Sequence, residues 1–302
     1  MDQIARHHYE LTFRLTFNEK KGDEFQDFFA SIMEKRYPGD FKRSRPWGNF
    51  GDWKNDGYLT SARQLFQCYA PNEMKSSKCL AKIVQDFKGA LPYWKKYFGM
   101  WVFVHNSKAG LGPAVLEKLL SLERKHAPLH LTSWGFEELR LVAMQLVELD
   151  LASLLGPSPS REGMIELGLK DLVPVLDHIA LFPAVPDPDL RPVPGDKLVR
   201  NQLSDSVAAL LKLGMSRADL VRKYFKLKPI LQDALAESFR SKYQELRIKT
   251  AAPDEIFGAL QRFAGGNLVP SPSRQNAVLA VLAFLFEECD IFERSPAGGD
   301  HS

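Results

Sequence analysis

The sequence lacks the features that would place it in a membrane or outside the cell. None of its apolar runs reaches the roughly 18 residues that a membrane-spanning helix needs. The first residues, MDQIARHHYELTF, show no apolar segment followed by a small-residue cleavage site. The chain has three cysteines, too few and too irregularly spaced for a disulfide framework or a zinc site. We therefore expect a cytoplasmic protein.

The common catalytic motifs are also missing. The sequence contains no phosphate-binding loop, no GxGxxG pattern, no HExxH, no GxSxG and no CxxC. The seven histidines are scattered, and the one adjacent pair, His7 and His8, precedes a predicted strand, where solvent exposure is the simpler interpretation. Any catalytic site must therefore come from residues that these motifs do not cover.

The net charge of +3 is unevenly distributed. Residues 1–110 carry 18 Lys and Arg against 12 Asp and Glu, a net charge of +6, and the remainder carries 22 against 25, a net charge of −3. A basic N-terminal half favours a polyanionic ligand, although ordinary surface charge explains the same excess.

Hydrophobic periodicity predicts an α/β N-terminal half. Residues 9–17 alternate between apolar and polar, which is typical of a strand with one buried face. Residues 25–33 repeat at helical spacing, and the glycine- and aromatic-rich stretch that follows predicts two or three short strands, the last over residues 64–70. Further helices are predicted over 75–88, from Pro113 and over 136–149, and further strands over 100–106 and 129–134. The alternation predicts a mixed sheet flanked by helices.

The C-terminal half shows no strand pattern. A helical segment over 161–181 is flanked by prolines, and residues 182–195 are too rich in proline for a helix or strand interior. Five helices are then predicted, over 197–213, 216–225, 229–247, 253–263 and 273–288. We predict an α/β domain over 1–150, a helical and Pro-rich linker over 151–195, an all-helical domain over 196–294 and a disordered tail over 295–302.

Three residues of the α/β half bear side chains suited to metal chemistry. Glu24 lies on the first predicted helix after the strand of residues 9–17, Asp56 in the turn GDWKNDGY and Gln67 on the strand QLFQCYAP. Metal-assisted phosphodiester cleavage needs hard oxygen ligands for a divalent ion and a nearby cation. A turn-capping role explains Asp56 as well, helix-dipole stabilisation explains Glu24, and a structural hydrogen bond explains Gln67.

These residues carry a resemblance to a known nuclease superfamily. The helix GDEFQDFF, the turn GDWKNDGY, the strand RQLFQCYAP and the strand WVFVHN resemble the PD-(D/E)xK nucleases, in particular their Mrr-like branch. The resemblance implies a restriction-endonuclease-like α/β fold that uses Mg²⁺ or Mn²⁺, with Asp56 and Gln67 as metal ligands and Glu24 as the helical acid. Tyr69 stands where the family has a lysine. The resemblance implies that Lys75, Lys78 or Lys82 in the next helical segment supplies the charge instead, and we expect Lys82 to be the substitute.

A basic group next to this set predicts contact with nucleic acid. Aromatic residues (Trp47, Phe50 and Trp53) are interleaved with it, as suits phosphate contact and base stacking, although a solvated basic loop with core aromatics explains the pattern equally. The expected nucleic-acid-binding residues are Lys42, Arg43, Arg45 and Lys54.

The C-terminal half carries a second resemblance. The segments GDKLVRNQLSDSV, DEIFGAL and AVLAVLAFLFEECDIFER look like the C-terminal domain of ABC-type three-component, Lamassu-related anti-phage defence systems. The resemblance implies an effector that cleaves DNA, held by an SMC-like ABC ATPase and a small middle component until it is triggered, with possible self-association on activation. The main alternative is a catalytically inactive nuclease fold that binds DNA or acts as a scaffold in the same kind of complex. A third option is that the N-terminal domain binds a small molecule or a phage protein.

Overall fold

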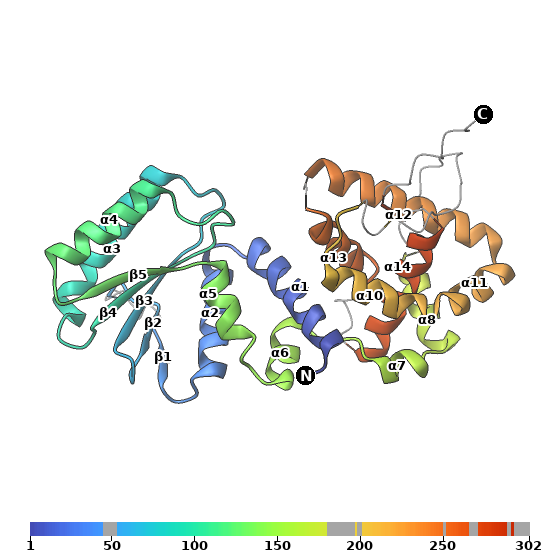
Figure 1. Ribbon diagram of the computed structural model, residues 1–302, viewed down its shortest axis with the longest axis horizontal. Helices are drawn as coiled ribbons and strands as arrows, with labels where there is room; N and C mark the ends of the chain where they lie inside the picture. The colour runs from blue at the N-terminus through green and yellow to red at the C-terminus, as the bar shows by residue number, and fades with distance from the viewer. Residues whose placement is uncertain are drawn as a thin grey trace. The chain divides into compact units, whose positions relative to one another are not determined.

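The computed structural model describes residues 1–44, 53–179, 197, 201–249, 252–265, 271–288 and 291–292 (Figure 1). Contacts divide the chain into two compact units. The N-terminal unit comprises Phe13–Leu154, and the C-terminal unit comprises Met1–Thr12 together with Leu155–Ser302. The predicted boundaries at residues 150 and 195 stay predictions. The predicted linker segment 182–195 and the predicted disordered tail 295–302 lie outside the described residues.

The N-terminal unit is built on a five-stranded mixed sheet, as the sequence predicts. Its strands follow chain order: β1 (Phe41–Arg43), β2 (Gly57–Leu59), β3 (Gln64–Tyr69), β4 (Met100–His105) and β5 (His130–Trp134). The first three strands pair antiparallel, whereas β3, β4 and β5 pair parallel. The carboxyl ends of β3, β4 and β5 therefore meet at one edge of the sheet, the edge where parallel strands usually present ligand-binding residues.

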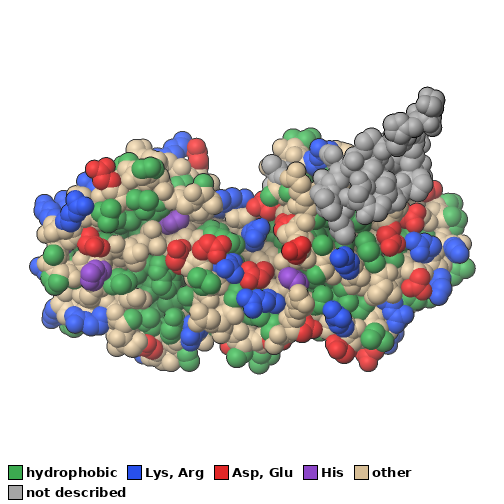
Figure 2. Space-filling model, in the orientation of Figure 1, with side chains coloured by type: hydrophobic (Ala, Val, Ile, Leu, Met, Phe, Trp, Pro, Cys, Tyr) green, Lys and Arg blue, Asp and Glu red, His purple; other side chains and the backbone are tan. Residues whose placement is uncertain are grey.

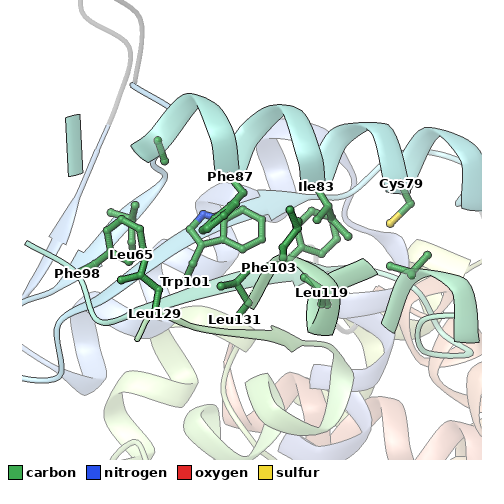
Figure 3. Close-up of a cluster of buried hydrophobic side chains, with 13 residues drawn as sticks. Leu65, Cys79, Ile83, Phe87, Phe98, Trp101, Phe103, Leu119, Leu129 and Leu131 are labelled. Carbon is green, nitrogen blue, oxygen red and sulfur yellow. The ribbon is translucent and has the colours of Figure 1, made fainter. Parts of the chain in front are cut away.

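Helices cover both faces of this sheet (Figure 1). One face carries α2 (Gly22–Arg36) and α5 (Phe136–Ala143), and the other carries α3 (Ser76–Trp94) and α4 (Pro113–Lys125). Figure 3 shows the apolar core under α3, where Ile83 and Phe87 point toward Trp101 and Phe103 of the central strand β4. Because β4 is covered on both sides, its sequence is almost continuously apolar.

The predicted strand over residues 9–17 is wrong, because this segment is part of helix α1 (Gln3–Glu19). The alternation has another physical cause. Tyr9, Phe13 and Phe17 are spaced four apart and form one stripe of the helix, while Leu11 and Leu15 form another, and all five side chains are buried. Because α1 is buried on two sides, apolar residues stand at every second position of residues 9–17. This pattern is the same as that of a half-buried strand.

Two predicted helices are each split in two. The helix predicted over 136–149 consists of α5 and α6 (Glu148–Leu155), and that over 161–181 consists of α7 (Arg161–Ile165) and α8 (Leu169–Ile179). The helix predicted over 197–213 is interrupted, because residues 201–204 are not helical and α10 (Asp205–Met215) starts after Ser204. The Ser204 hydroxyl accepts a hydrogen bond of 3.3 Å from the Val207 amide and so caps the helix.

The C-terminal unit is helical, as predicted, with no strand among its described residues, and is organised around α14 (Pro272–Glu287). Every residue of α14 from Gln275 to Phe286 is buried, because α10, α8 and α11 (Ala218–Leu227) pack around it. Helices α12 (Pro229–Lys249) and α13 (Pro253–Phe263) complete the unit. In the described part of the chain, none of the helices combines the length and the apolar character needed to cross a bilayer.

Candidate functional site

Asp56 lies at the centre of the candidate site, immediately before β2. Its side chain is 3% exposed, and its amide donates a 2.9 Å hydrogen bond to the Phe66 carbonyl of β3. Oδ2 accepts hydrogen bonds from the Gln67 side-chain amide at 2.7 Å and from the Cys68 backbone amide at 2.6 Å. Oδ1 accepts one from the Gln26 side chain of α2. The structure thus brings two of the predicted site residues, Asp56 and Gln67, into direct contact.

Helix α2 begins at the carboxyl end of β3. The Gly22 amide donates a 2.7 Å hydrogen bond to the Ala70 carbonyl, one residue beyond the strand. Glu24 follows in the first turn of α2, where it is exposed and adds negative charge near the positive end of the helix dipole. The α2 side chain that reaches Asp56 is Gln26, two residues later. Sequence reasoning missed Gln26, because a glutamine in the first turns of a helix belongs to no pattern that indicates a functional contact.

Gln67 carries a buried side-chain amide whose nitrogen and oxygen differ in their partners. The residue is 4% exposed, and its Oε1 atom has no hydrogen-bond partner among the residues that the structure describes. A buried polar atom without a partner costs free energy unless a ligand or water satisfies it. Together with the Asp56 carboxylate it gives two neighbouring oxygen-bearing side chains.

Tyr69 occupies the position where the nuclease pattern has lysine. Its ring is half-buried against the core under α3, with its centroid 5.9 Å from that of Phe103. Burial raises the pKa of the Tyr69 hydroxyl, which keeps it neutral at physiological pH. The residue therefore supplies no positive charge, and a cation for this site has to come from elsewhere.

Lys82, the predicted substitute, binds a carboxylate on its own helix. Its ammonium lies 2.9 Å from Oδ2 of Asp86, whose side chain is 0% exposed, and the Lys54 ammonium lies 3.4 Å from Oδ1 of the same residue. Asp86 therefore joins α3 to the segment that precedes Asp56. Sequence reasoning did not single out Asp86. The feature that could have identified it is an acidic residue at an inward position of α3, between Ile83 and Phe87.

The other predicted nucleic-acid-binding residues have protein partners as well. Lys42 donates a 2.6 Å hydrogen bond to the Gly39 carbonyl, and Arg43 forms an ion pair with Asp27. Arg45 lies outside the described residues, as do Trp47 and Phe50. A surface ion pair contributes little to stability, so Arg43 can exchange its contact with Asp27 for a phosphate contact at small cost.

The ligands present are compatible with a magnesium site that a substrate completes. In the described segments, no group of three or more His, Cys, Asp and Glu side chains is arranged to hold a metal ion. Mg²⁺ is commonly held by one or two carboxylates together with water and substrate phosphates rather than by a cage of protein ligands. The Asp56 carboxylate and the Gln67 amide oxygen fit a site of this kind, in which water and substrate phosphates supply the remaining ligands.

Comparison with known proteins gives one finding, which concerns the C-terminal unit. Neither the curated proteins nor the solved structures include a match to this chain. Residues 170–293 match the family model for C-terminal domain 10 of the ABC-three component (ABC-3C) systems. The C-terminal part of the chain is thus similar to a domain of these multi-component systems.

Proposed function

We propose that the chain is the effector subunit of a bacterial anti-phage defence system and that its N-terminal unit is a metal-dependent DNA endonuclease. The observation that carries the enzymatic part is the contact between Asp56 and Gln67 on adjacent segments of the sheet, beside the start of α2. The match of residues 170–293 to an ABC-3C domain supports the assignment to a defence complex. An SMC-like ABC ATPase and a small middle component are the proposed partners, and self-association on activation is part of the same proposal.

Each residue of the site has a role in this proposal. Asp56 and Gln67 would hold Mg²⁺ or Mn²⁺, which polarises a scissile phosphate and favours water attack on it. Glu24, exposed at the start of α2, would orient a water molecule or assist the ion. Lys82 would place positive charge near the phosphate, and Lys54, which shares the Asp86 carboxylate with it, adds a second ammonium.

The proposal predicts that Asp56→Asn abolishes DNA cleavage. The substitution preserves the size of the side chain but removes the one anionic ligand, so we expect the rate to fall by about 100-fold or more. Plasmid cleavage by the full chain, with its partner complex and trigger DNA, in Mg²⁺ or Mn²⁺ measures this. Thermal unfolding of the variant shows whether it is still folded. Equal cleavage by the folded variant and the wild type would contradict the assignment of Asp56.

A second candidate is a nuclease fold that binds DNA without cleaving it. Two observations favour it: Tyr69 replaces the expected lysine, and three donors already engage the Asp56 carboxylate. In that case the wild-type complex binds DNA but leaves the plasmid intact under every metal condition, and Asp56→Asn changes neither DNA binding nor partner binding.

A further inference from the structure

Two aromatic side chains are stacked on the surface of the N-terminal unit. The rings of Trp53 and Tyr93 are nearly parallel, at an interplanar angle of 4°, with centroids 5.0 Å apart. They nevertheless remain 45% and 49% exposed, and Tyr97, three residues beyond the end of α3, is 48% exposed. Aromatic residues usually bury most of their surface, so an exposed stack of this kind indicates a binding surface.

The chain uses strained backbone to hold Trp53 in place. Trp53 and Lys54 both adopt left-handed conformations, with φ of 50° and 59°, which residues other than glycine seldom adopt and which cost free energy. Lys54 secures this conformation through its ion pair with the buried Asp86. Gly89 leaves the room for it, since a Cβ atom there would lie 2.8 Å from Lys54 Cγ.

Positive charge is frequent in the last turns of α3 and just beyond it, the part of the helix that bears Tyr93. Lys88, Lys95 and Lys96 are exposed on or directly after α3, and the Lys96 ammonium lies 4.9 Å from the centroid of the Tyr97 ring. Arg63 donates a 3.0 Å hydrogen bond to the Tyr97 carbonyl, which keeps its guanidinium at this end of the helix. Figure 2, which draws one face of the molecule, shows lysine and arginine side chains among hydrophobic and acidic ones on that face.

We propose that Trp53 and Tyr93 form a stacking platform for an unpaired nucleobase, with Lys54 and the lysines of α3 contacting the flanking phosphates. The inference rests on the proposed function and deepens it by naming the substrate class as nucleic acid with a single-stranded segment. Aromatic rings flanked by ammonium groups are what proteins use to bind unpaired nucleotides. In a duplex the faces of the bases are covered by their neighbours, so the platform selects unpaired nucleotides. Lys54 also connects the platform to the cleavage site, since it is two residues from Asp56 in the chain.

The test is oligonucleotide binding by the full chain carrying Asp56→Asn, without divalent metal, so that cleavage does not interfere. The probes are fluorescently labelled single-stranded DNA, single-stranded RNA and blunt duplex DNA of equal length. We expect one of the single strands to bind more tightly than the duplex. Trp53→Ala and Tyr93→Ala should each weaken that binding by about 10-fold to 100-fold, and Trp53→Phe should retain most of it.

Tyr37→Ala is the matched control. Tyr37 is a partly exposed tyrosine with an arginine, Arg36, 4.9 Å from its ring centroid, but it ends α2 on the opposite face of the sheet. We expect this variant to bind like the parent. Equal affinity for single strands and duplex, together with no loss in Trp53→Ala and Tyr93→Ala, would overturn the platform. Plasmid cleavage by the wild-type complex would then still support the proposed function, so the two ideas fail independently.

Discussion

Replacing both Lys54 and Lys82 with methionine is expected to lower the free energy of unfolding of the N-terminal unit by about 3–5 kcal/mol. The two ammonium groups are 36% and 30% exposed, but the Asp86 carboxylate between them is 0% exposed. Removing both cations leaves the buried Asp86 carboxylate without its two lysine partners. Such a buried charge costs far more free energy than the loss of a surface ion pair. Urea unfolding, followed by tryptophan fluorescence, measures the effect.

The single variants and a triple variant serve as controls. Each single lysine-to-methionine change leaves the other ion pair in place, so we expect each to cost much less than half of the double change. Adding Asp86→Leu to the double variant removes the buried charge and should restore most of the stability. A double variant within about 0.5 kcal/mol of the wild type would show that Asp86 does not depend on the two lysines.

Lowering the pH from 7 to 4 is expected to cost each unit about 3 kcal/mol through one buried histidine. Burial lowers the pKa of His8 and of His105 from 6.5 to about 4. Both residues are 3% exposed, so the expected solvent exposure of His8 is wrong, and neither nitrogen of His8 has a hydrogen-bond partner among the described residues. In the unfolded chain each histidine binds a proton below pH 6.5, whereas in the folded chain it does so only near pH 4. The contribution of each histidine to the free energy of unfolding is therefore fully present above pH 6.5 and is lost between pH 6.5 and pH 4.

The positions of the tryptophans allow the contributions of His8 and His105 to be measured separately. All five tryptophans lie between residues 47 and 134, so tryptophan fluorescence reports only the N-terminal unit, which contains His105. His105→Asn retains an acceptor for the Ser107 amide, which now donates to Nδ1 at 3.2 Å, but does not titrate in this range. We expect it to flatten the pH dependence of the fluorescence transition. His8→Phe should leave the fluorescence transition unchanged. It should instead flatten the pH dependence of the unfolding transition measured by far-ultraviolet circular dichroism, which reports helix content.

If the histidine variants show the same dependence of the free energy of unfolding on pH as the wild type, the burial of the two imidazole rings is contradicted. If His105→Asn and the wild type lose equal stability between pH 6.5 and pH 4, the acid sensitivity of the N-terminal unit comes from other groups. Carboxylates lose their ion pairs toward the lower end of this range, and the histidine contribution is distinguished by its beginning near pH 6.5.

Periodicity predicted most elements of the fold but failed for α1, which is buried on two sides. Residues 25–33 show one apolar stripe and form α2 as expected, because one face of that helix packs on the sheet. In α1 both stripes are buried, so the alternation of Tyr9 to Phe17 carried no information that separates helix from strand. The order of the strands and the end of α5 at Ala143 depend on tertiary packing, which single-sequence patterns do not report.

The candidate site was predictable only in part, for a related reason. Asp56 and Gln67 belong to segments whose strand or turn character could be recognised, and they do contact each other. Asp86 and Gln26 complete the arrangement through contacts between distant segments: Asp86 with Lys54, and Gln26 with Asp56. A sequence pattern shows that an inward acidic residue on a helix needs a partner, but it does not show which one.

The most direct test of the central claim, that Asp56 and Gln67 form a metal site, is the thermal unfolding of Gln67→Glu with and without Mn²⁺ or Mg²⁺. Gln67 now donates to Asp56 at 2.7 Å, so glutamate there places two carboxylates in contact. Without metal the two charges repel, and we expect a lower Tm than in the wild type. With metal both become ligands, and we expect the Tm to rise by several degrees more than in the wild type, with no such rise when Asp56→Asn is added. A Tm of Gln67→Glu that does not respond to either metal ion would contradict the metal site.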